Sequence, residues 1–195
     1  MQPIAEQHLR ACRGFGLVVG AGAGRWDWPS PCEAWDARAV LEHVIGFHDV
    51  LVLRPLGAKP HRPRDDAPAR WHLTYGALAT VLARSALLER PTDIPAIGDN
   101  PPMQLDLSTL LPMLMQDVLV HTWDLAQAVE VDTRLDPDLC AACYERLPAD
   151  PDTLAASGTF AAAVVVRPDA DVQDRLIGRL GRDPSWRSPR SGSRL

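Results

Sequence analysis

The chain has 195 residues, of which 46% are hydrophobic and 23% charged, and its formal net charge is −5. This is the balance of an ordinary globular protein with a sizeable core. The negative charge argues against the basic surface that nucleic acids and anionic membranes attract. No stretch reaches the ~18 apolar residues of a membrane helix, and the N-terminus lacks the pattern of a secretion signal. We therefore predict a reduced, cytoplasmic protein with neither a nucleic-acid nor a membrane partner.

Apolar spacing in the first two thirds of the chain predicts four long helices. The first covers residues 4–19, and the second runs from a cap at Asp36 to about Leu53. After a polar, Pro-rich connection at 58–70, a third helix is expected over 71–90. A loop is predicted at 91–104, and the fourth helix covers roughly 108–129.

The last third of the chain has a different pattern. Asp136 and Pro137 are typical of a helix start, and Asp171 and Gly181 bound another short helix. Between them the stretch "FAAAVVVRP" at 160–168 favours a short strand or an extended segment.

These patterns predict an all-α fold, with a four-helix bundle and a small C-terminal extension made of a short strand and a helix. We assign residues 1–135 to the bundle. Residues 136–186 are expected to pack on it as a helix, a strand and a helix, and 187–195 to form a mobile tail. Together these parts would make one structural domain.

The fourth predicted helix carries a polar stripe inside an apolar run, "QDVLVHTWDLA" at 116–126. Asp117, His121 and Asp124 are three or four residues apart and therefore share one helical face. A carboxylate and an imidazole one turn apart can bind one metal ion, and His43 of the second helix is the best candidate for a third ligand. Such a site would keep positions open for substrate, and Asp124 could orient a ligand or accept a proton.

A simpler interpretation is also possible for this stripe. Asp117 and His121 could form a local ion pair, and His43 could be an ordinary hydrogen-bonded core residue. Burying polar groups without partners costs several kcal/mol, roughly, so the stripe requires some explanation.

Other polar residues give weaker signals. The C-x-x-C at 140–143 lies in a predicted helix and has no second pair, which favours buried structural thiols. His48 follows His43 by five residues, so it faces another side of the helix. It is expected at the surface, with the mouth of a pocket as the alternative. His8 and Cys12 have no predicted partner.

Three segments together resemble a known group of proteins. "PSPCEAWDARAVLEHVIG" resembles the first signature of the N-terminal domain of mycothiol-dependent maleylpyruvate isomerases. "DVLVHTWDLAQAV" and "RPDADVQDRLIGRLGRDPSW" resemble two later signatures of a metal-binding branch of that group, in the same order. The resemblance spans residues 30–186. It implies a DinB-like four-helix bundle whose metal ligands fall on His43, Asp117 and His121, although the isomerases have Glu where this chain has Asp117.

The resemblance also implies a function. One divalent metal, with zinc favoured over nickel or iron, would activate a low-molecular-weight thiol such as mycothiol as co-substrate. The thiolate would then be transferred to a small electrophilic substrate or would isomerise it. The alternatives are a thiol-independent hydrolase, cyclase or isomerase that uses metal-bound water, and a non-catalytic metal- or ligand-binding protein. We expect a small-molecule substrate and a monomer or homodimer.

Overall fold

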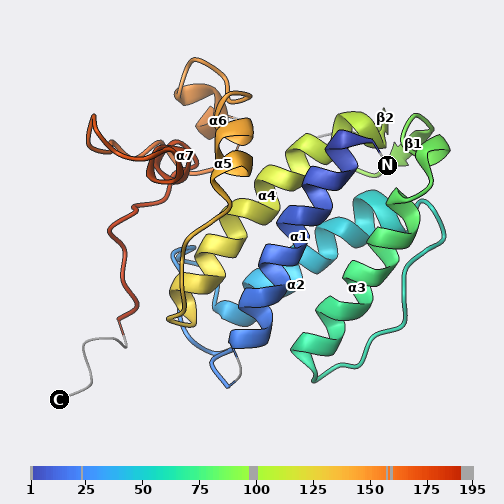
Figure 1. The fold of residues 1–195 in the computed structure, drawn as a ribbon, viewed down its shortest axis with the longest axis horizontal. Coiled ribbons are helices and arrows are strands. Elements are labelled where there is room, and N and C mark those ends of the chain that lie inside the picture. Colours follow the sequence, from blue (N-terminus) through green and yellow to red (C-terminus); the bar gives the residue numbers. More distant parts are fainter. Residues whose placement is uncertain (1, 23, 97–100, 157, 159, 190–195) are drawn as a thin grey trace. The chain divides into compact units, whose positions relative to one another are not determined.

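Figure 1 shows the computed structural model, which describes residues 2–22, 24–96, 101–156, 158 and 160–189. Seven α-helices occur among the described residues: α1 (Pro3–Ala21), α2 (Ala37–His48), α3 (Ala67–Leu82), α4 (Leu107–Ala128), α5 (Pro137–Tyr144), α6 (Asp152–Ala156) and α7 (Val172–Arg179). A π-helical segment (Asp49–Leu53) continues α2, and a 3₁₀ turn (Ser85–Leu87) follows α3. Strands β1 (Pro91–Ile94) and β2 (Met103–Asp106) pair antiparallel. None of the described helices has the length and hydropathy that crossing a bilayer requires.

The chain divides into two compact units. The first comprises residues 1–20 and 41–118, and the second comprises residues 21–40 and 119–195. The division falls inside α2 and inside α4, so each of these two continuous helices contributes to both units.

In the first unit, α1 packs against α3 through aromatic residues. Phe15 of α1 is fully buried and meets Trp71 of α3 edge-on, with ring centroids 4.7 Å apart. Helix α3 begins at Ala67 because the Asp66 side chain accepts a hydrogen bond from the backbone N–H of Ala69. These contacts fix α1 and α3 as neighbours, with a shared apolar core.

The Pro-rich connection before α3 is fixed to the first unit by a buried ion pair. Arg62 donates two hydrogen bonds to the Asp49 carboxylate, at 2.7 and 2.9 Å, and a third at 2.7 Å to Thr74 of α3. Asp49 opens the π-helical segment, and both side chains of the pair are only 5% exposed. This bidentate pair therefore holds the connection against both neighbouring helical segments.

In the second unit, α5 and α7 pack against each other. Both begin as the sequence predicts, since Asp136 caps α5 and Asp171 caps α7 with their side-chain carboxylates. Gln173 of α7 adds hydrogen bonds to the backbone of Leu135 and Thr133. The segment before α5 is thereby joined to α7.

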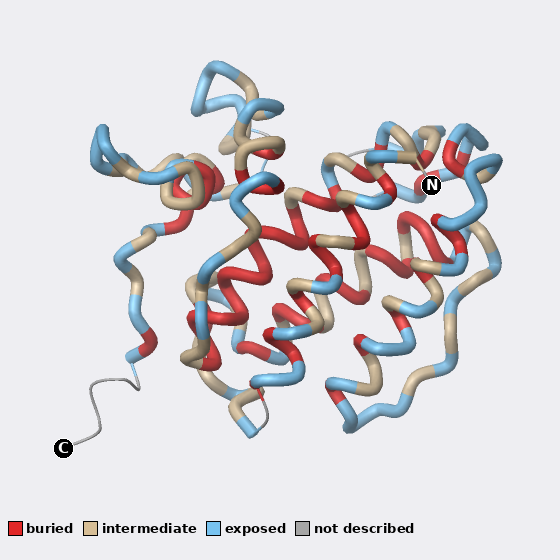
Figure 2. Tube along the Cα trace, viewed as in Figure 1, coloured by how far each residue is buried: buried red, intermediate tan, exposed pale blue. Residues whose placement is uncertain are grey.

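Burial along α4 is unusual. Every residue from 117 to 129 is buried, so the second half of this helix has no solvent-facing side. Figure 2 shows this as a nearly continuous red stretch, whereas α3 alternates between red and blue. Polar side chains in this part of α4 must therefore find partners inside the protein.

Most predicted helices are confirmed: residues 4–19 lie within α1, 108–129 corresponds to α4, and the helices capped by Asp136 and Asp171 are present. The predicted third helix over 71–90 is displaced. It starts four residues earlier because of the Asp66 cap, and it ends at Leu82 because the backbone at Arg84 leaves the helical region.

The predicted fold class, an all-α four-helix bundle with a short strand and a helix as its extension, is wrong. The predicted loop at 91–104 instead contains β1 and the start of β2, which pair as a two-stranded sheet. Residues 160–168, expected as a strand, pair with no strand among the described residues. The four long helices also do not form a compact unit of their own, because the division of the chain passes through α2 and α4. The apolar second half of α4 is grouped with the C-terminal segments instead. Residues 97–100 of the predicted loop and 190–195 of the predicted tail lie outside the described residues.

Two glycines explain how the segment 161–166 packs without being a strand. Val164 donates a backbone hydrogen bond to the Gly178 carbonyl at 2.8 Å. A Cβ on Gly178 would lie 2.8 Å from the Val164 carbonyl oxygen, and a Cβ on Gly181 would lie 2.6 Å from the Ala161 carbonyl oxygen. Gly181 also has φ +77°, which L side chains rarely adopt. The segment 161–166 is thus held by close approach of its backbone to that of Gly178 and Gly181, and not by pairing with a strand.

Gly181→Ala is expected to lower the free energy of unfolding by about 2 kcal/mol, because a Cβ would meet the Ala161 carbonyl in a left-handed backbone conformation. The matched control is Gly76→Ala in α3, which has open space around its Cβ and should raise stability by up to ~1 kcal/mol. Urea unfolding of the three proteins measures both. A Gly181→Ala protein as stable as the wild type would show that the close approach is not required.

Candidate metal centres

In the first unit, two of the residues predicted as metal ligands meet between helices. His43 of α2 and Asp117 of α4 lie 3.2 Å apart, measured from Nε2 to Oδ1. The His43 side chain is 23% exposed and that of Asp117 is 10% exposed. The His43 side chain is therefore the more exposed member of the pair, and Asp117 is the more sheltered one.

His121, the third predicted ligand, lies one turn beyond Asp117 on α4. Because α4 is a continuous helix, this spacing is fixed locally by the helical period. His43, Asp117 and His121 form one of the groups of side chains that could hold a metal ion.

The ring of His121 is held by two neighbours in the second unit. Its Nδ1–H donates to Oδ2 of Asp124 at 2.9 Å. Trp35 packs beside the ring, with centroids 5.4 Å apart. A histidine whose Nδ1–H donates to a carboxylate is held in one orientation, which is the arrangement that metal-binding histidines usually have.

Asp124 is completely buried and forms an ion pair that the sequence analysis missed. Arg182, which follows α7, donates to Oδ2 of Asp124 at 3.0 Å and also contacts the Cys32 sulfur at 3.4 Å. The Arg182 side chain is 8% exposed and the Asp124 side chain is 0% exposed. The only sequence signal was the position of Arg182 in the "GRDP" segment that resembles a family signature.

A second group of potential ligands lies wholly within the first unit. His8 and Cys12 of α1 and His48 of α2 are each 0% exposed. The Nε2 atoms of His8 and His48 are 3.1 Å apart. The Cys12 sulfur lies 3.5 Å from Nε2 of His8 and 3.9 Å from Nε2 of His48. These residues, named the His–Cys–His cluster below, offer ligand atoms that all lie within 4.8 Å of one another.

This cluster corrects the expectation that His48 lies at the surface and that His8 and Cys12 lack partners. The π-helical segment carries the chain on from His48, whose Nδ1–H donates to the Val44 carbonyl at 2.6 Å. A local signal existed, because His8 and Cys12 are separated by the same four residues as Asp117 and His121. The contact with His48 is between helices and could not be read from spacing.

Burial dominates the acid–base behaviour of the cluster. It lowers the pKa of His8 well below its ordinary value, and the neighbouring His48 lowers it further. Burial also lowers the pKa of His48 and raises that of Cys12. Both imidazoles are therefore neutral near pH 7, with the thiol protonated when nothing is bound.

The C-x-x-C at 140–143 behaves as the sequence indicated. Burial raises the pKa of Cys140 to about 12 and that of Cys143 to about 11. Both residues are buried in α5 and reduced. Thiols with such pKa values form little thiolate near neutral pH and are poor nucleophiles.

Arg182→Met is expected to lower the free energy of unfolding by about 3–5 kcal/mol, because it leaves the buried Asp124 carboxylate without its charged partner. Combining it with Asp124→Leu removes the uncompensated charge and should restore part of the loss. Arg167→Met serves as the control, since its pair with Asp169 is exposed on both sides and should contribute nothing measurable. Equal effects of Arg182→Met and Arg167→Met in denaturant unfolding would contradict this account.

Comparison with known proteins places the chain among uncharacterized relatives. Over 152 residues it is 30% identical to the uncharacterized protein Rv0738 of Mycobacterium tuberculosis, and the match covers 76% of this chain and 78% of the relative. The uncharacterized protein MT0763 from another strain of that species matches to the same extent. Neither a protein-family model nor a solved structure matches the chain. The chain therefore belongs to the family of these uncharacterized mycobacterial proteins.

Proposed function

We propose that the protein is a metal-dependent enzyme, and that His43, Asp117 and His121 hold one divalent cation, with zinc favoured. The observation that carries the proposal is the 3.2 Å contact between His43 Nε2 and Asp117 Oδ1, with His121 one turn further along the same helix. Two imidazoles and one carboxylate are the donor set of catalytic zinc sites, which leave a position open.

The surroundings of His121 support this assignment. In metal sites a ligating histidine usually donates its second ring N–H to a carboxylate, which fixes the tautomer and the ring orientation. Asp124 accepts that hydrogen bond, and Arg182 fixes Asp124 in turn. Because Asp124 is fully buried, we assign it to positioning His121 and not to contact with substrate.

The exposed edge of His43 gives the proposed site an open side. There a low-molecular-weight thiol such as mycothiol would meet a small electrophilic substrate, as the resemblance to the maleylpyruvate isomerase group implies. A bound divalent cation supplies Lewis-acid chemistry, which lowers the pKa of a thiol so that thiolate forms near neutral pH. The role of His43, Asp117 and His121 is to bind that cation, and the role of Asp124 and Trp35 is to orient the His121 ring.

Metal content tests the ligand set. His43→Ala, Asp117→Ala and His121→Ala should each lose one equivalent of zinc per chain relative to the wild type, measured on protein saturated with zinc and then freed of excess. His72→Ala, which removes an exposed histidine, should lose none. Wild type that takes up no zinc, nickel or iron(II), or ligand variants that keep every equivalent, would refute the proposed site.

Asp124→Asn separates positioning from ligation. The amide keeps the size of the side chain but weakens the hydrogen bond to His121, so zinc affinity should fall about 10–100-fold without loss of the site. Competition with a chromophoric chelator measures this change. Unchanged affinity would remove Asp124 from the site.

The thiol requirement is tested by turnover. Zinc-loaded protein should accelerate the reaction of a small electrophile, such as an activated alkene, only when a low-molecular-weight thiol is added, and His121→Ala should abolish the acceleration. Acceleration without thiol would favour chemistry by metal-bound water instead.

A further inference from the structure

The His–Cys–His cluster has no role in the proposed reaction, yet it places three polar side chains in the core of the first unit. Buried imidazoles and thiols need partners, because leaving a polar group unpaired inside a protein costs free energy. Nδ1 of His8 has no hydrogen-bond partner among the described residues. The polar contacts of this ring are thus made through Nε2, which points at His48 and Cys12.

Hydrogen bonding alone satisfies the cluster poorly. His48 already uses its Nδ1 proton on the Val44 carbonyl, so its Nε2 carries a lone pair. His8 can donate one proton to it at 3.1 Å, and the thiol is only a weak donor at 3.5–3.9 Å. Three potential ligand atoms therefore lie close together with only one N–H and one weak S–H available to form hydrogen bonds among them.

The spacing of these atoms fits a metal ion better. Two imidazole nitrogens at ~2.0 Å and a thiolate at ~2.3 Å from one zinc ion lie about 3.3–3.8 Å apart in trigonal or tetrahedral geometry. The observed separations of 3.1, 3.5 and 3.9 Å lie around that range. The intervening volume can therefore accommodate an ion with only small side-chain adjustments.

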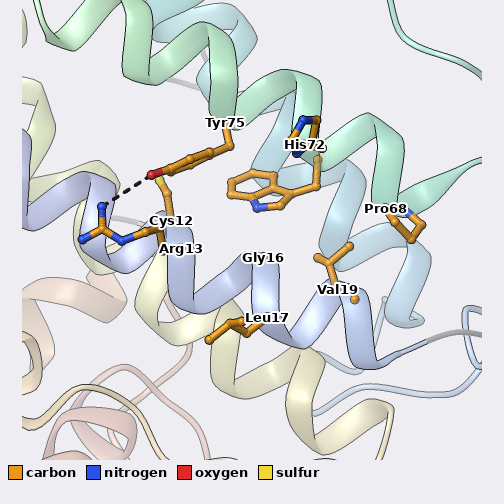
Figure 3. A pocket seen from close by; sticks show the side chains of 10 residues that line it. Cys12, Arg13, Gly16, Leu17, Val19, Pro68, His72 and Tyr75 are labelled. Atoms are coloured by element: carbon orange, nitrogen blue, oxygen red, sulfur yellow. Dashed lines mark hydrogen bonds between the residues drawn. The ribbon is translucent and has the colours of Figure 1, made fainter.

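Two further features favour a cation at this place. Burial lowers the pKa of both His8 and His48, and the negative charge of Asp117 opposes part of that lowering, so it would also attract a bound cation. Cys12 lines a cavity of about 550 Å³ between α1 and α3, which Figure 3 shows with Arg13 and Tyr75 at one end. The buried Cys12 side chain therefore lies next to this cavity.

We propose that His8, Cys12 and His48 form a second metal site, which binds a thiophilic d¹⁰ cation, Zn²⁺ or Cu⁺, through one thiolate and two imidazole nitrogens. Binding releases one proton, from the Cys12 thiol, while both imidazoles stay neutral. The site is closed on the protein side, since all three ligands are fully buried. Its role is therefore structural or storage-like, and it stands independently of the function proposed for His43, Asp117 and His121.

Cobalt(II) provides the first test, because only the second site contains sulfur. Cobalt-loaded wild type should show the near-ultraviolet thiolate-to-cobalt charge-transfer absorption, and Cys12→Ser should lack it. His121→Ala, which removes a ligand of the other site, and Cys140→Ser, which removes an unrelated thiol, should both keep it. Loss of the absorption in Cys140→Ser but not in Cys12→Ser would overturn the proposal, as would its absence from the wild type.

Displacement then distinguishes the two cations. Zn²⁺, or Cu⁺ added without oxygen, should abolish the cobalt absorption, and the tighter competitor identifies the preferred ion. Affinity for it should fall more than ~100-fold in Cys12→Ser, since loss of a ligand exceeds the effect of losing a group that only orients one. Failure of both cations to displace cobalt would count against the site.

A measurement without substitutions in the cluster keeps the proposal testable if Cys12→Ser does not fold. X-ray absorption of zinc-loaded His121→Ala protein should show one sulfur at ~2.3 Å and nitrogens at ~2.0 Å from the ion. A shell without sulfur would overturn the second site and leave the proposed function unaffected. Conversely, a sulfur ligand in this spectrum, together with a zinc content of His121→Ala equal to that of the wild type, would refute only the proposed function.

Discussion

Complete burial of the second half of α4 is the constraint from which the rest of the structure follows. Residues 117–129 have no solvent-facing side, yet they include two carboxylates and an imidazole. Each of these polar groups has little contact with water and therefore needs a partner inside the protein. Asp117 meets His43 of α2, and Asp124 meets Arg182 from beyond α7. Because the apolar residues of α4 bury this half of the helix, its polar groups pair with residues that are distant in the sequence, and those residues become part of the site.

The same constraint explains why a buried ion pair is tolerated. Asp124 and Arg182 gain little net stability over an apolar pair, since removing two charges from water is costly. Their value lies in orientation. Arg182 fixes the carboxylate and the carboxylate fixes one tautomer of His121, so the ring presents a single nitrogen in a single direction. A neutral, oriented imidazole is more useful for binding a cation than a freely rotating one.

The two groups of potential ligands share one construction. In each, two side chains come from consecutive turns of one helix: Asp117 and His121 on α4, and His8 and Cys12 on α1. A single histidine from α2 completes each group, His43 for the first and His48 for the second. They differ in exposure, because His43 keeps part of its ring accessible while His48 is completely buried. This difference in exposure is why we propose substrate chemistry for the first group and permanent ion binding for the second.

The sequence by itself determined what depends on neighbouring residues. Caps such as Asp136 and Asp171 fixed helix starts, and the helical period placed Asp117 beside His121, because both effects act within one or two turns. The same rule would have paired His8 with Cys12. Only the tertiary structure decided that His48 points into the core, that Arg182 reaches Asp124 across 58 residues of chain, and that the long helices do not form a separate bundle. Those outcomes depend on how distant apolar faces pack, and residue spacing carries no information about that.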